Sequence, residues 1–169
     1  MTDNLTLEKI IDFLLDVEMF SALDIGELSE IVSIMDIQRI KSGEHIFSEG
    51  EVGDGWYVIF EGTVIVRKRT PFHRDQEVAE LGPGACFGEM ALLDDAPRSA
   101  TVMTNSALLA FRFSRRKFLR LLHQDSLGAY KLVYGMACVL ARRQRKLNQN
   151  VTELQREVES LDRESALST

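Results

Sequence analysis

The apolar residues at the start of the chain recur with the spacing of a helix. Counted from residue 7, positions i, i+3, i+4, i+7 and i+8 are apolar: Leu7, Ile10, Ile11, Leu14 and Leu15. This spacing places them on one face of an amphipathic helix. A second helical pattern follows over residues 23–32, with Ser21 or Asp24 as the residue that caps its start. Residues 1–36 are therefore expected to form N-terminal helices.

The pattern changes over residues 37–113, where short apolar runs alternate with glycine-rich breaks. Eight of the eleven glycines lie between Gly43 and Gly88. The runs 56–60 and 63–66 flank Glu61-Gly62, which predicts a hairpin. Further strands are expected in three more runs, over 78–81, 101–103 and 108–113. Many short strands separated by turn residues are typical of a β-roll or barrel. The predicted fold is therefore α+β, with a β-roll or jelly-roll barrel of short antiparallel strands between helical segments.

Helical spacing returns over residues 114–169. An apolar cluster at 118–122 predicts one helix, and a long helix follows from about Asp125. Leucines then recur every seven residues, each preceded three positions earlier by a second heptad residue: Leu140, Leu147, Leu154 and Leu161, with Ala137, Gln144, Val151 and Val158. We expect these helices to end in a coiled coil.

The heptad pattern has two interpretations. Branched residues at position a with leucine at position d favour a parallel two-stranded coiled coil, in which the polar Gln144 costs stability but fixes the register. Glu157 and Asp162 oppose this arrangement, because like charges would face each other across the dimer. The alternative is one long amphipathic helix packed on its own domain. We expect the first, a homodimer formed through the C-terminal helix.

The composition is that of one soluble globular domain. The chain has 169 residues, 45% hydrophobic and 27% charged, which is enough for a hydrophobic core. Its net charge of −6 argues against a dedicated nucleic-acid binder. Apolar runs stay short of the roughly 18 residues that span a bilayer, and the start of the chain lacks the pattern of a signal peptide. We expect no contact with a membrane.

The cysteines and histidines exclude further classes. Cys86 and Cys138 are far apart and give neither a disulfide framework nor a metal-ligand spacing, which indicates the reducing cytoplasm. His45, His73 and His123 are scattered, whereas a metal-binding barrel of the cupin type needs clustered histidines and a carboxylate. The sequence suggests no Ser–His–Asp or Cys–His set. We therefore expect no metal and no enzymatic activity.

The strongest chemical signal lies in residues 86–101. An ionised Glu89 only accepts hydrogen bonds and suits a sugar hydroxyl, whereas Arg98 presents a fork of donors that matches phosphate oxygens. Gly88 lets the backbone pass close to a ligand, and residues 89–92 can form one helical turn whose N–H groups point at an anion. A weak surface ion pair is the alternative for any lone Glu and Arg at this spacing. The residues between the two favour a site for a ligand that carries a hydroxyl and a compact anion.

The segments Phe87-Gly88-Glu89-x-Ala91-Leu92-Leu93 and Pro97-Arg98-Ser99-Ala100-Thr101 resemble the phosphate-binding cassette of the cyclic-nucleotide-binding domain family. This family includes the regulatory subunits of protein kinase A, the catabolite activator protein and cyclic-nucleotide-gated channels. The resemblance implies that Arg98 binds the cyclic phosphate and that Glu89 accepts from the ribose 2′-hydroxyl. It also implies phosphate contacts from the backbone N–H groups of Ala91 and Leu92, a ribose contact from Gly88, and a hydroxyl at Ser99 that reaches the phosphate or the purine. The candidate ligand-binding residues are Phe87, Gly88, Glu89, Met90, Ala91, Leu92, Arg98 and Ser99.

Weaker matches, at 18–31, 43–62 and 81–84, extend the resemblance over about residues 15–145. The implied ligand is cyclic AMP or cyclic GMP: Ser99 leans toward cyclic GMP, yet many binders of cyclic AMP carry Ser or Thr there. The candidates for covering the base are Tyr134, Cys138 and Arg142. Gly135 is either a pivot in a last helix that folds over the nucleotide or a small residue where two helices touch.

The resemblance implies a stand-alone regulatory module. Ligand binding would shift the terminal helices between open and closed arrangements and pass the signal to an unknown effector protein. Residues after the basic cluster 142–146 continue a single heptad instead of forming a helix-turn-helix, so no direct DNA binding is expected. The alternative is a dimeric scaffold that keeps the fold but does not respond to nucleotide, and the intact Glu89 and Arg98 count against it. An enzyme of the cupin type is the least favoured hypothesis.

Overall fold

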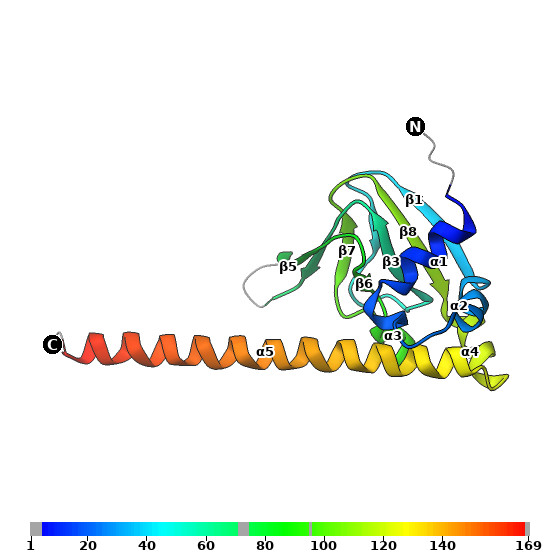
Figure 1. The fold of residues 1–169 in the computed structure, drawn as a ribbon. Coiled ribbons are helices and arrows are strands. Elements are labelled where there is room, and N and C mark those ends of the chain that lie inside the picture. The colour runs from blue at the N-terminus through cyan, green and yellow to red at the C-terminus, as the bar shows by residue number, and fades with distance from the viewer. Residues whose placement is uncertain (1–4, 71–74, 95, 168–169) are drawn as a thin grey trace. The chain divides into compact units, whose positions relative to one another are not determined.

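The computed structural model of the chain describes residues 5–70, 75–94 and 96–167. The chain divides into two compact units, Met1–Gly135 and Met136–Thr169. The first unit contains the N-terminal helices, the strands and the start of the last helix, and the second unit contains the rest of that helix (Figure 1).

Helices form at the N-terminus where the apolar spacing predicts them. They are α1 (Leu7–Leu15), the short 3₁₀ helix η1 (Glu18–Phe20) and α2 (Ile25–Val32). Asp24 caps α2, because its carboxylate accepts from the Glu27 backbone N–H at 2.8 Å. The Glu27 carboxylate accepts in return from the Asp24 N–H at 2.9 Å. This capping box satisfies two donors that a helix start leaves free.

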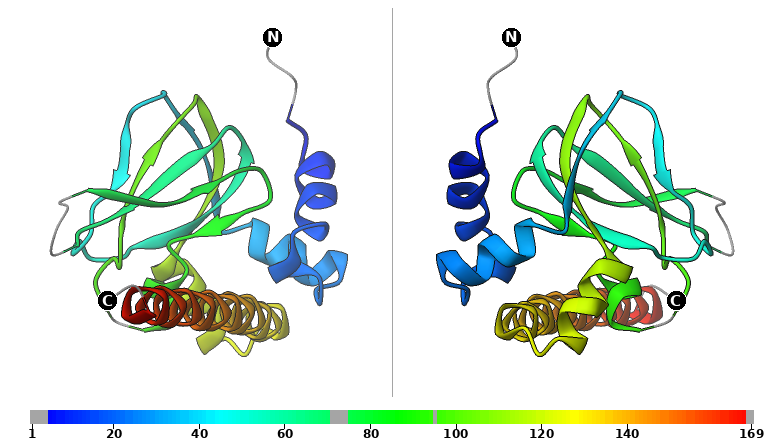
Figure 2. Two further views of the ribbon diagram at one scale, coloured as in Figure 1. Left: turned by 90° about the vertical axis from the view of Figure 1, so that its left-hand side faces the viewer. Right: turned by 90° about the vertical axis from the view of Figure 1, so that its right-hand side faces the viewer.

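Eight antiparallel strands in the described residues form two four-stranded sheets, and the predicted α+β fold class is confirmed. The first sheet has the order β1 (Met35–Ile40), β8 (Leu108–Ser114), β3 (Gly55–Glu61) and β6 (Cys86–Phe87). The second sheet has the order β2 (His45–Phe47), β7 (Thr101–Thr104), β4 (Val64–Lys68) and β5 (Gln76–Leu81). Figure 2 shows the N-terminal helices to one side of this roll of strands.

The hairpin predicted at Glu61-Gly62 is wrong. Strand β3 pairs with β6 and β8, whereas β4 pairs with β5 and β7, so β3 and β4 lie in different sheets. Gly62 has a φ of 92°, and a Cβ added there would lie 2.2 Å from the carbonyl oxygen of Ala107. The chain therefore turns a corner into the second sheet against the 107 backbone instead of folding back on β3.

The central strand β3 is buried on both faces. Its Tyr57 and Ile59 belong to the core between the sheets, whose buried members are Phe47, Tyr57, Ile59, Val64, Phe87, Val102, Leu108 and Ala110. On its other face Trp56 stacks on Phe113 with ring centroids 4.8 Å apart and meets Phe118 edge-on at 5.1 Å. This double burial explains why β3 is continuously apolar, since neither face of the strand meets water.

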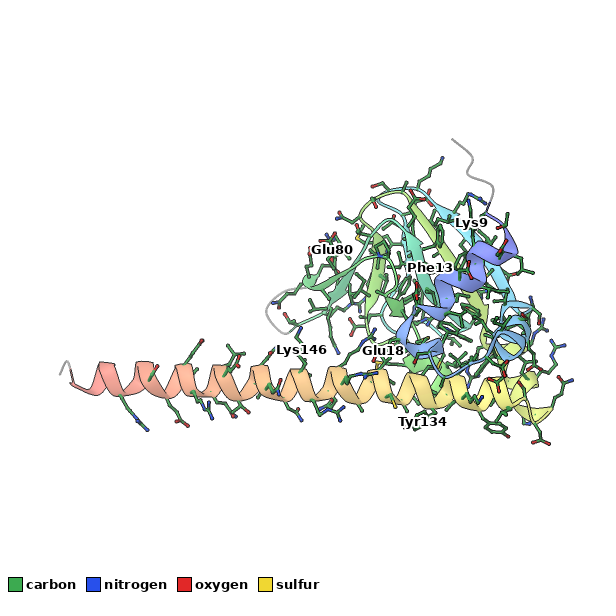
Figure 3. The ribbon with its side chains drawn as sticks, viewed as in Figure 1. Lys9, Phe13, Glu18, Glu80, Tyr134 and Lys146 are labelled. Atoms are coloured by element: carbon green, nitrogen blue, oxygen red, sulfur yellow. The ribbon has the colours of Figure 1, made fainter. Side chains whose placement is uncertain are left out.

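Phe13 attaches α1 to the first sheet. Figure 3 labels this residue on α1. Its ring contacts Phe60 at a centroid distance of 4.8 Å and Phe111 at 5.9 Å, both edge-on. Edge-to-face pairs of this kind add about 0.5–1.5 kcal/mol beyond their burial. The N-terminal helices are thus packed on the outer face of the sheet that carries β3.

Two helices follow the strands. Helix α4 spans Arg115–His123, and α5 begins at Leu127 and extends to Leu167. Two glycines bring the start of α5 close to the N-terminal helices. A Cβ on Gly128 would lie 3.0 Å from Cβ of Glu27, and one on Gly135 would lie 2.1 Å from the Met19 carbonyl oxygen. Gly135 is therefore a point of close packing between α5 and η1.

Two polar contacts join the same elements. The ammonium group of Lys131 donates to both carboxylate oxygens of Glu27, at 2.6 and 2.8 Å. Ser126, just before α5, donates through its hydroxyl to the Glu30 carboxylate at 2.6 Å. The first turns of α5 are thus tied to α2 by charge as well as by packing.

Candidate functional site

The candidate site is built where β6 leads into the short helix α3 (Met90–Leu93). Gly88, between the two, has a φ of 78°, and a Cβ there would lie 2.7 Å from Nη1 of Arg98. A residue with a side chain would therefore be strained in its backbone and would press on the guanidinium. Glu89 is the N-cap of α3 and is only 3% exposed. The fold thus brings the glycine next to the arginine side chain that lies ten positions later.

The Arg98 side chain is buried and held by backbone carbonyls. It is 4% exposed, Nη1 donates to the Gly88 carbonyl at 2.9 Å, and Nη2 donates to the Gly55 carbonyl at 2.8 Å. Its guanidinium carbon lies 4.0 Å from the ring centroid of Phe47, a cation–π contact. The side chain is thus oriented from two strands, β3 and β2, as well as from its own segment.

The Arg98 backbone is fixed as well. Its N–H donates to the Glu51 carbonyl at 2.8 Å, and its carbonyl accepts from the Gly50 N–H at 2.9 Å. The residue that carries the guanidinium is therefore paired on both backbone groups with the turn at 50–51, which lies between β2 and β3. A well-ordered backbone is what a preformed binding group requires.

The charge of Arg98 is only partly balanced. Burial lowers the pKa of Arg98, and Tyr57 and Asp54 oppose this effect. The Asp54 carboxylate lies 3.5 Å from Nη2, but its side chain is 69% exposed and is shared with Arg112 at 2.6 Å. A buried cation whose ion-pair partner is largely solvated is costly. An anion bound at this point would therefore be favoured.

The guanidinium also keeps donors for such an anion. Arginine carries five N–H donors, and Nη1 and Nη2 each give one of theirs to a carbonyl. The Nε–H of Arg98 has no hydrogen-bond partner among the described residues. The arrangement can thus hold a compact oxyanion while the two carbonyls keep the fork in place.

Arg112 is the second cation near the site. Burial works against its charge, but Asp54 and Tyr57 outweigh that effect and raise the pKa of Arg112. It pairs with Asp54 at 2.6 Å and lies 3.8 Å from Asp36. Asp54 therefore pairs with two arginines, and it lies immediately before β3.

The other predicted site residues divide into buried and exposed ones. Phe87 is buried and stacks on Tyr57 with centroids 5.0 Å apart, so it lies in the core under the site. Met90 and Ser99 are exposed neighbours, the Ser99 hydroxyl lying 3.7 Å from the Met90 sulfur. The Leu92 N–H donates to the Glu89 carbonyl at 3.0 Å and is already paired. Ala91 lies in α3, and its side chain falls outside the described residues.

The three candidates for covering the base differ in their position. Tyr134 is exposed and points away from the sheets (Figure 3). Cys138 and Arg142 belong to the second unit. Which of the three covers the base stays a prediction.

Four residues belong to the site without being predicted from the sequence: Phe47, Asp54, Gly55 and Arg112. Phe47 and Asp54 lie in the 43–62 stretch that matches the family weakly, but nothing in that stretch alone links them to Arg98. The usable signal was a glycine-rich turn with an aspartate immediately before an apolar strand. Arg112 gave no signal, since its approach depends on the pairing of β3 with β8.

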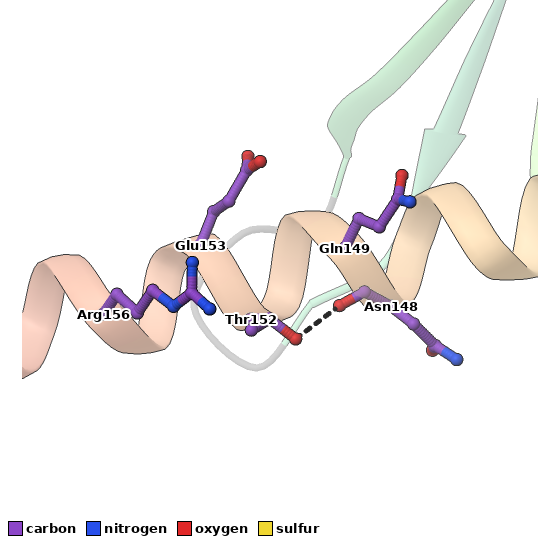
Figure 4. Close-up of a pocket in the computed structure, with 5 residues that line it drawn as sticks. All are labelled: Asn148, Gln149, Thr152, Glu153 and Arg156. Carbon is purple, nitrogen blue, oxygen red and sulfur yellow. Dashed lines mark hydrogen bonds between the residues drawn. The ribbon is translucent and has the colours of Figure 1, made fainter.

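Two other features do not form a site. A hollow on α5 is lined by residues of that helix alone: Asn148, Gln149, Thr152, Glu153 and Arg156 (Figure 4). The described part of the chain does not include His73. Within that part, no three or more side chains that could ligate a metal lie together. In the same part of the chain, no helix has the length and apolar character needed to cross a membrane.

Comparison with known proteins agrees with this geometry. The profile of the family described as "Cyclic nucleotide-binding domain" matches residues 37–125. The chain belongs to this family. Domains of the family are typically regulatory modules without catalysis, and the expectation that this chain is not an enzyme stays a prediction.

The cyclic nucleotide-binding domain is similar to parts of longer proteins. The cAMP-dependent protein kinase regulatory subunit of Mycosarcoma maydis is 38% identical over 115 residues, covering 65% of this chain and 22% of that protein. The catabolite activator protein of Thermus thermophilus has a TM-score of 0.72 at 27% identity, covering 82% of this chain and 63% of that one. The regulatory domain of Toxoplasma gondii PKA with cAMP has a TM-score of 0.65 at 28% identity, covering 75% and 48%. The chain thus spans only about a fifth of the curated relative.

Proposed function

We propose that this chain binds a cyclic nucleotide, cAMP or cGMP, and acts as a regulatory module. The observation that carries the proposal is the guanidinium of Arg98, a residue that is 4% exposed. Two carbonyls fix this group, and no described residue accepts its Nε–H. A cyclic phosphate supplies the negative charge and the oxygens that this group lacks. The similarity to a PKA regulatory domain whose structure contains cAMP supports the same ligand class.

The other residues of the site are assigned to the ribose, the phosphate and the purine. Glu89 accepts a hydrogen bond from the ribose 2′-hydroxyl, and Gly88 contacts the ribose through its backbone. The N–H groups of Ala91 and Leu92 donate to the phosphate, the latter while shared with the Glu89 carbonyl. Met90 and Ser99 are both exposed, and in this proposal the Ser99 hydroxyl reaches the phosphate or the purine. No metal takes part in this mode of binding.

Asp54 offers a route from the ligand to the helices. Its carboxylate faces Arg98 and Arg112, and its backbone carbonyl accepts from the N–H of Arg115, the first residue of α4, at 2.9 Å. A phosphate bound to Arg98 competes with the Asp54 carboxylate for the guanidinium. Ligand binding thus acts on Asp54, the residue whose carbonyl holds the start of α4. The signal then passes through the C-terminal helices to an unknown effector protein. The module is expected in the cytoplasm, as a homodimer through α5, without binding DNA or a membrane.

A non-responsive dimeric scaffold is the second candidate. Backbone carbonyls of the chain itself already accept hydrogen bonds from both terminal nitrogens of Arg98 and from the Leu92 N–H, which favours this candidate. A site satisfied by its own backbone has less to gain from a ligand. The scaffold retains the fold and the dimer but shows no response to nucleotide.

Thermal unfolding separates the two candidates. The protein is melted alone and with cAMP, cGMP, 5′-AMP or 5′-GMP, each well above micromolar concentration. A ligand at one hundred times its Kd stabilises the native state by about 2.7 kcal/mol, which a melting curve resolves. Stabilisation by a cyclic nucleotide and not by its non-cyclic counterpart supports the proposal. No shift with any of them, in protein that mass spectrometry finds free of bound nucleotide, favours the scaffold.

A further inference from the structure

The second unit exposes a continuous apolar stripe. Its members, at heptad positions a and d of α5, are Leu147 (59% exposed), Val151 (49%), Leu154 (60%) and Val158 (57%). Soluble proteins rarely expose large apolar side chains in a contiguous row unless another surface covers them. The stripe therefore needs an occupant, and the charges beside it indicate which one.

The charges along this part of α5 are segregated. The basic segment, residues 142–146, has four cations and no carboxylate: Arg142, Arg143, Arg145 and Lys146. The acidic segment, residues 153–159, has three carboxylates and one cation: Glu153, Glu157 and Glu159, with Arg156. All these side chains are exposed. A second copy of the same helix is thus charge-complementary to the first only when it runs in the opposite direction.

We propose that α5 pairs with α5 of a second copy as an antiparallel coiled coil. This proposal rests on the homodimer proposed above and specifies its geometry. Antiparallel packing sets a positions against d positions, with Leu147 opposite Val151 of the second copy and Leu140 opposite Val158. The basic segment of each copy then lies beside the acidic segment of the other. Arg143 lies next to Glu157 of the second copy, and two-fold symmetry repeats this pair.

A parallel dimer has the opposite electrostatics. It aligns the two basic segments with each other and sets Glu157 beside the acidic position 162 of the second copy. The sequence signal for a parallel dimer is the branched residue at position a. Only Val151 and Val158 supply it, because the other two a positions hold Ala137 and Gln144. The charges therefore decide the orientation.

Gln144 does not need a second glutamine opposite it. Its side-chain amide donates to the Asn148 side-chain oxygen at 3.2 Å, within the same helix. In the antiparallel register it faces Leu154 of the second copy, with its amide directed along its own helix toward Asn148. A polar residue satisfied in this way lowers the cost of placing it against an apolar one.

Charge reversal on the full chain tests the orientation. Sedimentation equilibrium gives the dimer Kd of the wild type, Glu157→Arg, Arg143→Glu and the double variant, each also at high salt. The two orientations predict opposite signs for Glu157→Arg. Antiparallel pairing turns two attractive pairs into repulsive ones and weakens the dimer about tenfold, whereas parallel pairing relieves a repulsion and tightens it. Glu159→Arg makes the same change of charge at an outward heptad position, and circular dichroism checks that each helix remains.

The antiparallel proposal expects each single variant at 143 or 157 to weaken the dimer, and the double variant to return to within about threefold of the wild type. It also expects these differences to shrink at high salt. A tighter or unchanged dimer in Glu157→Arg overturns the orientation but leaves the homodimer and nucleotide binding standing. A wild-type chain that stays monomeric overturns both this inference and the proposed homodimer, while the nucleotide titration tests the ligand separately.

Discussion

Replacing Arg98 by alanine should abolish tight nucleotide binding while leaving a folded domain. The guanidinium offers a cyclic phosphate the Nε–H and the N–H groups that Gly88 and Gly55 leave unused. Losing one partner of a buried charge pair costs about 2–5 kcal/mol. That range corresponds to a Kd about 30-fold to several thousand-fold higher.

The stability of the Arg98→Ala variant separates lost binding from lost folding. The change removes the cation–π contact with Phe47 and leaves two carbonyls without their donor, but it also removes a costly buried charge. We expect a net loss of about 1–3 kcal/mol in the free energy of unfolding. Calorimetric titration below the melting temperature measures the Kd. Arg98→Lys keeps the charge without the fork, and Arg116→Ala removes an exposed cation from α4. A folded Arg98→Ala protein that binds a cyclic nucleotide within about threefold of the wild type would refute the role given to this residue.

Three further variants test separate parts of the site and its coupling. Glu89→Gln keeps the shape of a 3% exposed side chain but loses a charged acceptor, so binding should weaken by about tenfold or more at nearly unchanged stability; equal affinity in titration would exclude the ribose contact. Ser99→Ala should change the ratio of cGMP to cAMP affinity more than their mean, and an unchanged ratio in a competition assay removes Ser99 from base selection. Gly135→Ala in a free helix gains up to about 1 kcal/mol, yet here its Cβ would lie 2.1 Å from the Met19 carbonyl oxygen. We expect a loss of about 1–3 kcal/mol in urea unfolding, and a gain would show that α5 does not pack on η1.

The fold class was predictable because its signals are local and periodic. Helical spacing marks α1 and α2, and the glycine-punctuated runs mark most strands. The pairing of strands was not predictable in the same way. Glu61-Gly62 has the composition of a hairpin turn, but whether the chain folds back or crosses to another sheet depends on the Ala107 backbone, which is 45 positions away and packs on Gly62.

The part of the site that is contiguous in the sequence was predictable, whereas the residues that reach it from other strands were not. The residues from Phe87 to Ser99 form one segment, so a motif can contain them. Gly55, Asp54 and Phe47 reach the same guanidinium from β3, the residue before it and β2, and no spacing in the sequence encodes that meeting. A motif also does not tell which of its side chains are buried. Phe87 belongs to the motif, but its ring stacks on Tyr57 in the core.

The contacts of α5 restrict how a ligand signal can travel. A ligand shifts an equilibrium only by its difference in affinity between two states, so some element must have two positions. The start of α5 has little freedom relative to α2 and η1, since Gly128, Gly135 and the Lys131–Glu27 ion pair hold them together. We therefore expect these elements to move as one block, with the change in backbone angles taken up between α4 and α5. Asp125 lies in that connection with a φ of 57°, a value that non-glycine residues seldom adopt. Asp125 follows α4, the helix whose first N–H is held by the Asp54 carbonyl. A strained backbone at this position makes it a suitable place for the hinge.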